Sequence, residues 1–259
     1  MGMIGSAKAT LISRIIMATA MLVYVYKSKH FKIYYKAIRI KSISFSVMKK
    51  IAEIGIPSGL QFLFEVGAFC FATIMVGWLG IQQLAAHQIA LSIASITYMI
   101  ASGIGAAATV RVGNYYGQKD IVNLKLAGFS AVIMVTFLMI ICALTFILTR
   151  NLSPQFFSIN GDVKTIASSL LVIAAFFQLS DGIQVVSLGA LRGIADVRVP
   201  TYITLVSYWL IALPIGYALG FTFHLGVQGV WYGLLIGLTV AAILLLTRFY
   251  YKRKKFNLV

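Results

Sequence analysis

Seven long apolar stretches follow one another along this sequence, joined mostly by short polar links. They run near residues 3–26, 54–79, 84–109, 124–149, 165–188, 201–221 and 227–249. Each holds the roughly 20 mainly apolar residues that an α-helix needs to cross a bilayer. Because only helices and closed barrels satisfy every backbone hydrogen bond in lipid, the pattern predicts an all-α, polytopic transmembrane helix bundle of about seven spans.

The charge content agrees with a membrane environment. Charged residues make up 11% of the chain and hydrophobic residues 60%, whereas soluble domains carry about 25% charged residues. A net charge of +16 raises the question of nucleic acid, but the basic residues lie between apolar stretches and not on a folded soluble face. We therefore expect membrane lipids, and no nucleic acid, as partners. Cys70 and Cys142 both fall inside apolar stretches, which favours core positions over a disulfide or metal pair.

The distribution of Lys and Arg predicts the orientation. Residues 27–50 carry eight basic residues interleaved with aromatic and aliphatic ones, a pattern typical of a basic amphipathic segment on a membrane surface. Placing this linker in the cytoplasm puts eighteen basic residues on that side and two, Arg150 and Lys164, outside. Positive charge favours the cytoplasmic side, so we expect a multi-pass protein of the inner (plasma) membrane with a cytoplasmic C-terminus.

The first stretch is expected to be a true spanning helix and not a signal peptide. It is too long for one, and no cleavage site follows Tyr26. In this orientation it crosses from outside to inside with almost no leader before it. The sequence alone therefore suggests that partner helices upstream are missing.

Two acids lie deep in apolar stretches, Glu65 and Asp181. A charged side chain at such a depth costs at least ~2.5 kcal/mol by insertion scales, so each is a candidate functional residue. Glu53, at a cytoplasmic edge, is interpreted as an interfacial charge. Helical spacing predicts that Gln61, Glu65, Ala68 and Ala72 share one face of their helix, and that Phe177, Asp181, Val185 and Leu188 share another.

Two carboxyl groups in a cavity of low dielectric cannot both stay ionised without a partner. The pair is therefore expected to hold a proton, a metal cation or an organic cation, and exclusive occupancy of this kind is what an antiporter needs. The structural alternative is a pair of protonated, hydrogen-bonded acids that only join helices. No nucleophile–base pattern, phosphate loop or Cys/His metal spacing is present, so we expect neither an enzyme nor a cofactor.

Four segments, in order, resemble the multidrug and toxic compound extrusion (MATE) family. They are residues 2–14, Gly55-Ile56-Pro57 with Glu65, Ala85-Ala86-His87-Gln88-Ile89 followed by Thr109-Val110-Arg111-Val112-Gly113, and Gln178 with Asp181 followed by Gly189-Ala190-Leu191-Arg192-Gly193. They are similar to the sixth, seventh, eighth and tenth helices of the family. The resemblance covers essentially the whole chain.

The resemblance implies the C-terminal half of a carrier with twelve helices in two lobes. Residues 1–26 would be the sixth helix, 27–50 a cytoplasmic linker, 51–250 the second six-helix lobe and 251–259 a cytoplasmic basic tail. An N-terminal lobe would be the missing partner.

The resemblance also implies a binding site. In the NorM-like branch Glu65 and Asp181 match the acids of the cation site, which would also be sodium ligands in a sodium-coupled carrier. Tyr98 matches a tyrosine near that site, and Gln61 and Gln178 are the adjacent amides. Phe177 stands where some sodium-coupled members have a tyrosine, which favours proton over sodium coupling.

The function expected is a secondary active antiporter that exports cationic or amphipathic drugs or toxins in exchange for protons or sodium ions. Small organic cations would be its substrates. A non-transporting fragment or assembly subunit is the alternative from another class. A lipid-linked oligosaccharide flippase of the same superfamily is disfavoured, because its cavity needs basic residues and the cavity charges expected here are acidic.

Overall fold

The structure is a computed structural model that describes residues 2–28, 44–157 and 160–255. The chain divides into two compact units, Met1–Ile51 and Ala52–Val259, and each is described by itself. The first unit contains α1 (Gly2–Lys27), a mainly apolar helix that carries Lys8 and Arg14. Most of the predicted linker lies outside the described residues.

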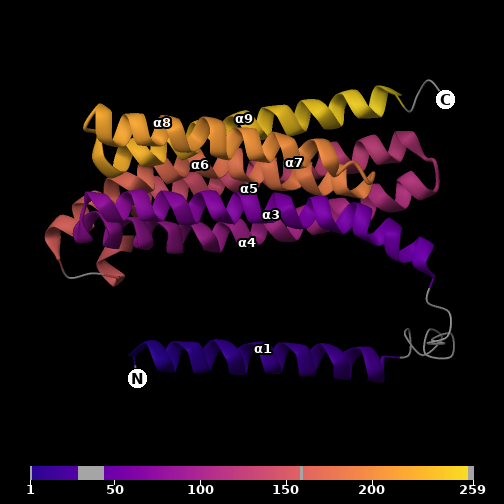
Figure 1. The fold of residues 1–259 in the computed structure, drawn as a ribbon, viewed down its shortest axis with the longest axis horizontal. Coiled ribbons are helices and arrows are strands. Elements are labelled where there is room, and N and C mark those ends of the chain that lie inside the picture. Colours follow the sequence, from indigo (N-terminus) through magenta and orange to yellow (C-terminus); the bar gives the residue numbers. More distant parts are fainter. Residues whose placement is uncertain (1, 29–43, 158–159, 256–259) are drawn as a thin grey trace. The chain divides into compact units, whose positions relative to one another are not determined.

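Within the described ranges, seven helices are long and apolar enough to cross a membrane, as the sequence predicts. After α1 they are α3 (Phe45–Leu79), α4 (Ile81–Gly117), α5 (Ile121–Thr149), α6 (Gly161–Gly193), the composite helix at Arg198–Thr222, and α9 (Gly226–Lys255). A short 3₁₀ turn, η3 (Ser153–Phe156), lies between α5 and α6. Figure 1 shows α3 to α9 running lengthwise through the second unit.

Several helices are longer than the apolar stretches that predict them. α3 begins at Phe45, so the last residues of the expected linker are helical, and α4 continues through Arg111 to Gly117. α6 continues to Gly193 and so includes Arg192, which the hydropathy pattern assigns to a link. The length of an apolar stretch reflects the thickness of the bilayer core, whereas a helix ends where its backbone hydrogen bonds are broken or capped.

Local chemistry explains where two helices start. The side chain of Asp120 accepts a hydrogen bond from the backbone N–H of Asn123 at 3.0 Å, which caps the N-terminus of α5. Asn160 caps α6 by accepting from the N–H of Asp162 at 2.9 Å. Both are residue types favoured at N-caps because a side-chain oxygen satisfies an otherwise unpaired N–H.

The sixth span is not a regular α-helix. It consists of α7 (Arg198–Leu205), η4 (Val206–Ala212), α8 (Leu213–Tyr217) and η5 (Ala218–Thr222), of which η4 and η5 are π-helical. π-helical turns insert an extra residue and are frequent at functional sites. Pro214, which lacks a backbone N–H donor, lies between the two π segments and fits this irregular winding.

α6 lies at the centre of the second unit, where it contacts α4, α5 and α9. Glycines bring α4 and α6 close together: a Cβ on Gly189 would collide with the carbonyl of Gly105. The hydroxyl of Thr109 is within 2.9 Å of the carbonyl oxygens of both Gly105 and Gly189. Small residues at such seams allow the backbones of membrane helices to approach each other.

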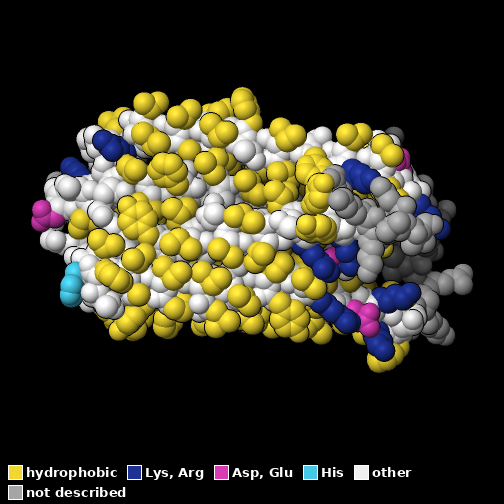
Figure 2. All heavy atoms as spheres, turned by 90° about the horizontal axis from the view of Figure 1, so that it is seen from above, with side chains coloured by type: hydrophobic (Ala, Val, Ile, Leu, Met, Phe, Trp, Pro, Cys, Tyr) yellow, Lys and Arg dark blue, Asp and Glu magenta, His cyan; other side chains and the backbone are white. Residues whose placement is uncertain are grey.

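The outer surface of the second unit is strongly apolar. Figure 2 shows hydrophobic side chains over the middle of the visible face, with Lys and Arg gathered toward its ends. Large exposed apolar side chains include Phe137 (67%), Leu148 (83%) and Tyr202 (68%). An exposed apolar area of this extent would aggregate in water but is the expected surface in a bilayer.

Candidate functional site

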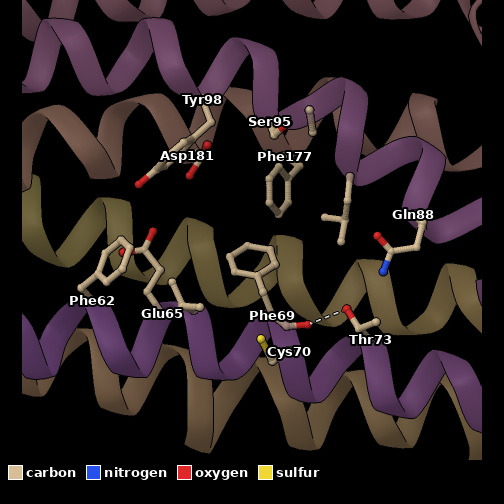
Figure 3. A pocket seen from close by; sticks show the side chains of 13 residues that line it. Phe62, Glu65, Phe69, Cys70, Thr73, Gln88, Ser95, Tyr98, Phe177 and Asp181 are labelled. Atoms are coloured by element: carbon tan, nitrogen blue, oxygen red, sulfur yellow. Dashed lines mark hydrogen bonds between the residues drawn. The ribbon is translucent and has the colours of Figure 1, made fainter. Parts of the chain in front are cut away.

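A cavity of about 400 Å³ opens between α3, α4 and α6. It is lined by Phe62, Glu65, Val66, Phe69, Cys70, Thr73, Gln88, Leu91, Ala94, Ser95, Tyr98, Phe177 and Asp181. Figure 3 shows Glu65 and Phe62 projecting from α3, with Tyr98 and Asp181 on the opposite side. We call this the acid cavity.

Glu65 lies on the buried face of α3. The buried residues of this helix include Gln61, Glu65, Ala68 and Ala72. This confirms the prediction, made from helical spacing, that these four residues share one face. Phe62 and Val66 lie together on one flank of that face, where both are exposed and line the acid cavity. The helix therefore turns one carboxyl group, one amide and small apolar side chains inward, while larger apolar side chains such as Phe62 and Leu63 are exposed.

Asp181 projects into the same cavity from α6. Its residue exposure is 7%, equal to that of Glu65, and the carboxylate of Glu65 acts on Asp181 as a like charge. Within the described part of the chain, neither carboxyl group forms a hydrogen bond or an ion pair. Buried carboxyl groups are ordinarily paired, so this arrangement is suited to a proton or to a bound cation.

Aromatic rings form much of the remaining wall. Tyr98 lies beside Asp181 (Figure 3). Phe177, buried at 4% exposure, packs edge-on against Phe69 with ring centroids 6.0 Å apart. It also packs against Trp231 at 5.8 Å. An apolar ring thus occupies the position where a tyrosine would bring a hydroxyl oxygen.

The two amides expected at the site are buried but do not line the acid cavity. Gln61 accepts a hydrogen bond at its Oε1 from Nη2 of Arg192, at 3.2 Å. The Nε2 atoms of Gln61 and Gln178 are buried without a hydrogen-bond partner among the described residues. Both amides are therefore buried outside the lining of the acid cavity, and their Nε2–H groups are unsatisfied in the described structure.

A second cavity, of about 450 Å³, adjoins the first. The two share Phe62, Glu65 and Tyr98, and the second is also lined by Arg192, Thr109 and Ser102. We call it the arginine cavity. It corrects the expectation that only acids face the cavities, since the guanidinium of Arg192 acts electrostatically on Glu65 and Tyr98. The sequence reasoning missed Arg192 because it ended the helix too early.

A separate buried polar cluster surrounds His87. Trp231 Nε1 donates to His87 Nδ1 at 3.0 Å, and His87 Nε2 lies 3.0 Å from Thr73 Oγ1. The Thr73 hydroxyl lies 2.9 Å from the carbonyl oxygen of Phe69. Among the residues described, no group of three or more His, Cys, Asp or Glu side chains is placed to hold a metal ion.

Comparison with known proteins identifies the family. The sequence profile of the MatE family matches residues 57–218. The chain is 34% identical over 248 residues to the probable multidrug resistance protein NorM of Xylella fastidiosa (strain 9a5c), a match that covers 96% of this chain and 53% of the relative. It is 37% identical over 254 residues to the NorM protein of Agrobacterium fabrum, covering 96% and 55%.

Solved structures share the fold. The chain superposes on the eukaryotic MATE transporter AtDTX14 with a TM-score of 0.85 at 24% identity, covering 97% of this chain and 58% of that one. A MATE protein in the straight conformation gives a TM-score of 0.87 at 22% identity, covering 100% and 58%.

This chain spans about half the length of the curated relatives it matches, and aligns with their C-terminal half. These relatives are named as probable multidrug resistance proteins, and the solved structures as MATE transporters. On the profile and on these relatives, the chain belongs to the MatE family.

Proposed function

We propose that this chain is the cation-binding lobe of a secondary active antiporter that exports cationic or amphipathic compounds. Glu65 and Asp181 would bind either the coupling ion or the cationic substrate. Two multidrug resistance relatives at 34–37% identity support this function class. One observation supports the acid cavity as the binding site: two buried carboxyl groups line it with no protein partner in the described structure.

The exchange follows from electrostatics. Two carboxylates in a cavity of low dielectric repel each other unless positive charge joins them. A proton and an organic cation can each supply that charge, but space and charge balance disfavour both together. Entry of one therefore expels the other, which couples the two movements.

We propose a proton as the coupling ion. Sodium needs several oxygen ligands, and the apolar ring of Phe177 removes one that a tyrosine would offer. A proton needs only a carboxyl oxygen. Sodium coupling through Glu65 and Asp181 is the competing outcome, and the experiment below separates the two.

Transport would need a second lobe. Alternating access in two-lobed carriers comes from one bundle rocking against the other around a midplane site. We therefore expect the chain alone, reconstituted in liposomes with a proton or sodium gradient, to bind a cationic dye without moving it. The basic residues favour a plasma-membrane location with the C-terminus in the cytoplasm.

Binding of ethidium to the purified chain in lipid nanodiscs tests the proposal. Glu65→Gln or Asp181→Asn should weaken binding by at least about tenfold, equivalent to about 1.4 kcal/mol. Glu53→Gln is the matched control, because Glu53 is an acid on the same helix with an exposed side chain. Affinity that falls with acidification at constant sodium supports proton coupling; affinity that falls only with added sodium supports the alternative. Wild-type binding in both acid variants would overturn the proposal.

A further inference from the structure

Arg192 and Asp181 lie on one face of α6. They are eleven residues apart, which at 3.6 residues per turn is close to three full turns and about 16 Å along the axis. Val185, Leu188 and Gly189, between them, line the arginine cavity. The same face of one helix therefore carries an acid at one end and a guanidinium at the other.

Among the described residues, the guanidinium of Arg192 forms no ion pair with a carboxylate. The ion pairs in the described ranges join Arg248 and Lys252 to Asp196. Arg192 donates to the neutral amide oxygen of Gln61, whose own Nε2–H group is buried without an acceptor among the described residues. In the described structure the Arg192 guanidinium therefore lines the cavity with a neutral amide as its hydrogen-bond partner and no hydrogen-bonded anion.

The two cavities form one elongated site whose two ends carry side chains of opposite charge. Glu65, Tyr98 and Phe62 line both, so a ligand can extend past them from Asp181 toward Arg192. Arg192 is bound to Gln61, which precedes Glu65 by one helical turn, or about 6 Å of rise. Phe62, Val110 and Val185 supply apolar wall along the arginine side.

We propose that the arginine cavity is a subsite for the anionic group of a zwitterionic amphipathic substrate. The cationic part would lie against Glu65 and Asp181, and a carboxylate about one helical turn away would accept hydrogen bonds from Arg192. Bidentate pairing with a guanidinium suits a carboxylate especially well. This inference rests on the proposed function, because it adds a second point of recognition to the same site.

A matched pair of dyes tests the subsite. Tetramethylrhodamine carries a delocalised cation and a carboxylate, and its methyl ester keeps the cation but loses the negative charge. Binding of each dye to the 259-residue chain in nanodiscs is measured by fluorescence anisotropy. Arg192→Gln should weaken binding of the carboxylate dye by about tenfold and change that of the ester by less than about twofold.

Two further variants control the measurement. Arg198→Gln removes an exposed arginine that lines neither cavity and should leave both affinities unchanged. Arg192→Lys keeps the charge but not the planar fork, so it should restore part of the carboxylate dye's affinity. Thermal unfolding of each variant establishes that it is folded.

The outcomes separate this inference from the proposed function. Equal loss of both dyes in folded Arg192→Gln, or no loss of the carboxylate dye, overturns the subsite. If in that case the ester still binds and is lost on Glu65→Gln, the proposed function stands. Wild-type chain that binds neither dye overturns both.

Discussion

Two polar clusters are buried in the same lobe, and they differ in how completely their hydrogen bonds are satisfied. In the His87 cluster, Trp231 can only donate, so His87 Nδ1 accepts and the ring carries its proton on Nε2. That Nε2–H donates to Thr73 Oγ1, whose own proton goes to the carbonyl of Phe69. Every donor in this chain of bonds has an acceptor.

The acid cavity is built in the opposite way. Glu65 and Asp181 are nearly as buried as His87 (7%, 7% and 0% exposure), yet within the described structure they lack a hydrogen-bonding partner and face open volume. Satisfied buried polar groups hold a structure together. Unsatisfied ones that line a cavity are positioned to bind something else. Burial alone does not separate these roles, whereas hydrogen bonding does.

The largest effect on stability is expected from the His87 cluster. His87→Ala leaves the Trp231 N–H and the Thr73 hydroxyl without their partner and opens a cavity between three helices. We expect the free energy of unfolding to fall by about 3 kcal/mol, measured by titration with sodium dodecyl sulfate. His224→Asn, at an exposed histidine with positive φ, is the control. Equal stability of the two variants would contradict a structural role for His87.

A somewhat smaller loss is expected at the α4–α6 seam, which holds Tyr98 beside Asp181. Gly189→Ala places a methyl group against the carbonyl of Gly105 and forces the helices apart. We expect a destabilisation of about 2 kcal/mol together with weaker ethidium binding. Gly103→Ala, on the exposed side of α4 with no atom within 4 Å of the new methyl group, should be neutral or slightly stabilising. The same loss in both variants would show that close packing is not the cause.

Thr73 sharpens the comparison because it belongs to both regions: it bonds to His87 and lines the acid cavity. Thr73→Val keeps the shape but removes the acceptor for His87 Nε2–H, so we expect a loss of about 1 kcal/mol in unfolding free energy. Thr73→Ser, which keeps the hydroxyl, should retain most of that stability. Ethidium affinity should be nearly unchanged in both. A binding defect larger than the stability defect would mean that the Thr73 hydroxyl also contacts the bound dye.

The smallest effect on stability is expected at Glu65, where the effect on ethidium binding is expected to be large. Glu65→Gln changes a carboxyl group that forms no hydrogen bond or ion pair in the described structure, so the free energy of unfolding should change by less than about 0.5 kcal/mol. The measurement is the same detergent titration, run beside Glu53→Gln. A loss comparable to that of His87→Ala would indicate that Glu65 joins helices and does not bind a ligand.

Much of this architecture can be predicted from the sequence because lipid imposes simple rules. Each spanning helix needs a long apolar stretch, and the inward face of α3 follows from the spacing of Gln61, Glu65, Ala68 and Ala72. Ionisable residues are so costly in lipid that Glu65 and Asp181 stand out at once.

Other features depend on information that hydropathy does not carry. Arg192 lies on the same face as Asp181 only because α6 continues to Gly193, past the end of its apolar stretch. The eleven-residue spacing is the signal that would have revealed it. His87 and Trp231 are 144 residues apart in the chain, so their contact follows from tertiary packing alone. The π-helical turns of the sixth span likewise have no counterpart in the apolar pattern.

Infrared difference spectroscopy on the chain in lipid tests most directly whether a cationic substrate replaces a proton on the two acids. Adding ethidium should reduce the C=O absorption of protonated carboxyl groups and increase that of carboxylates. This change should be absent in the Glu65→Gln/Asp181→Asn double variant and retained in Glu53→Gln. Binding of the dye by the wild-type chain with no change in the carboxyl region would contradict proton exchange at this pair.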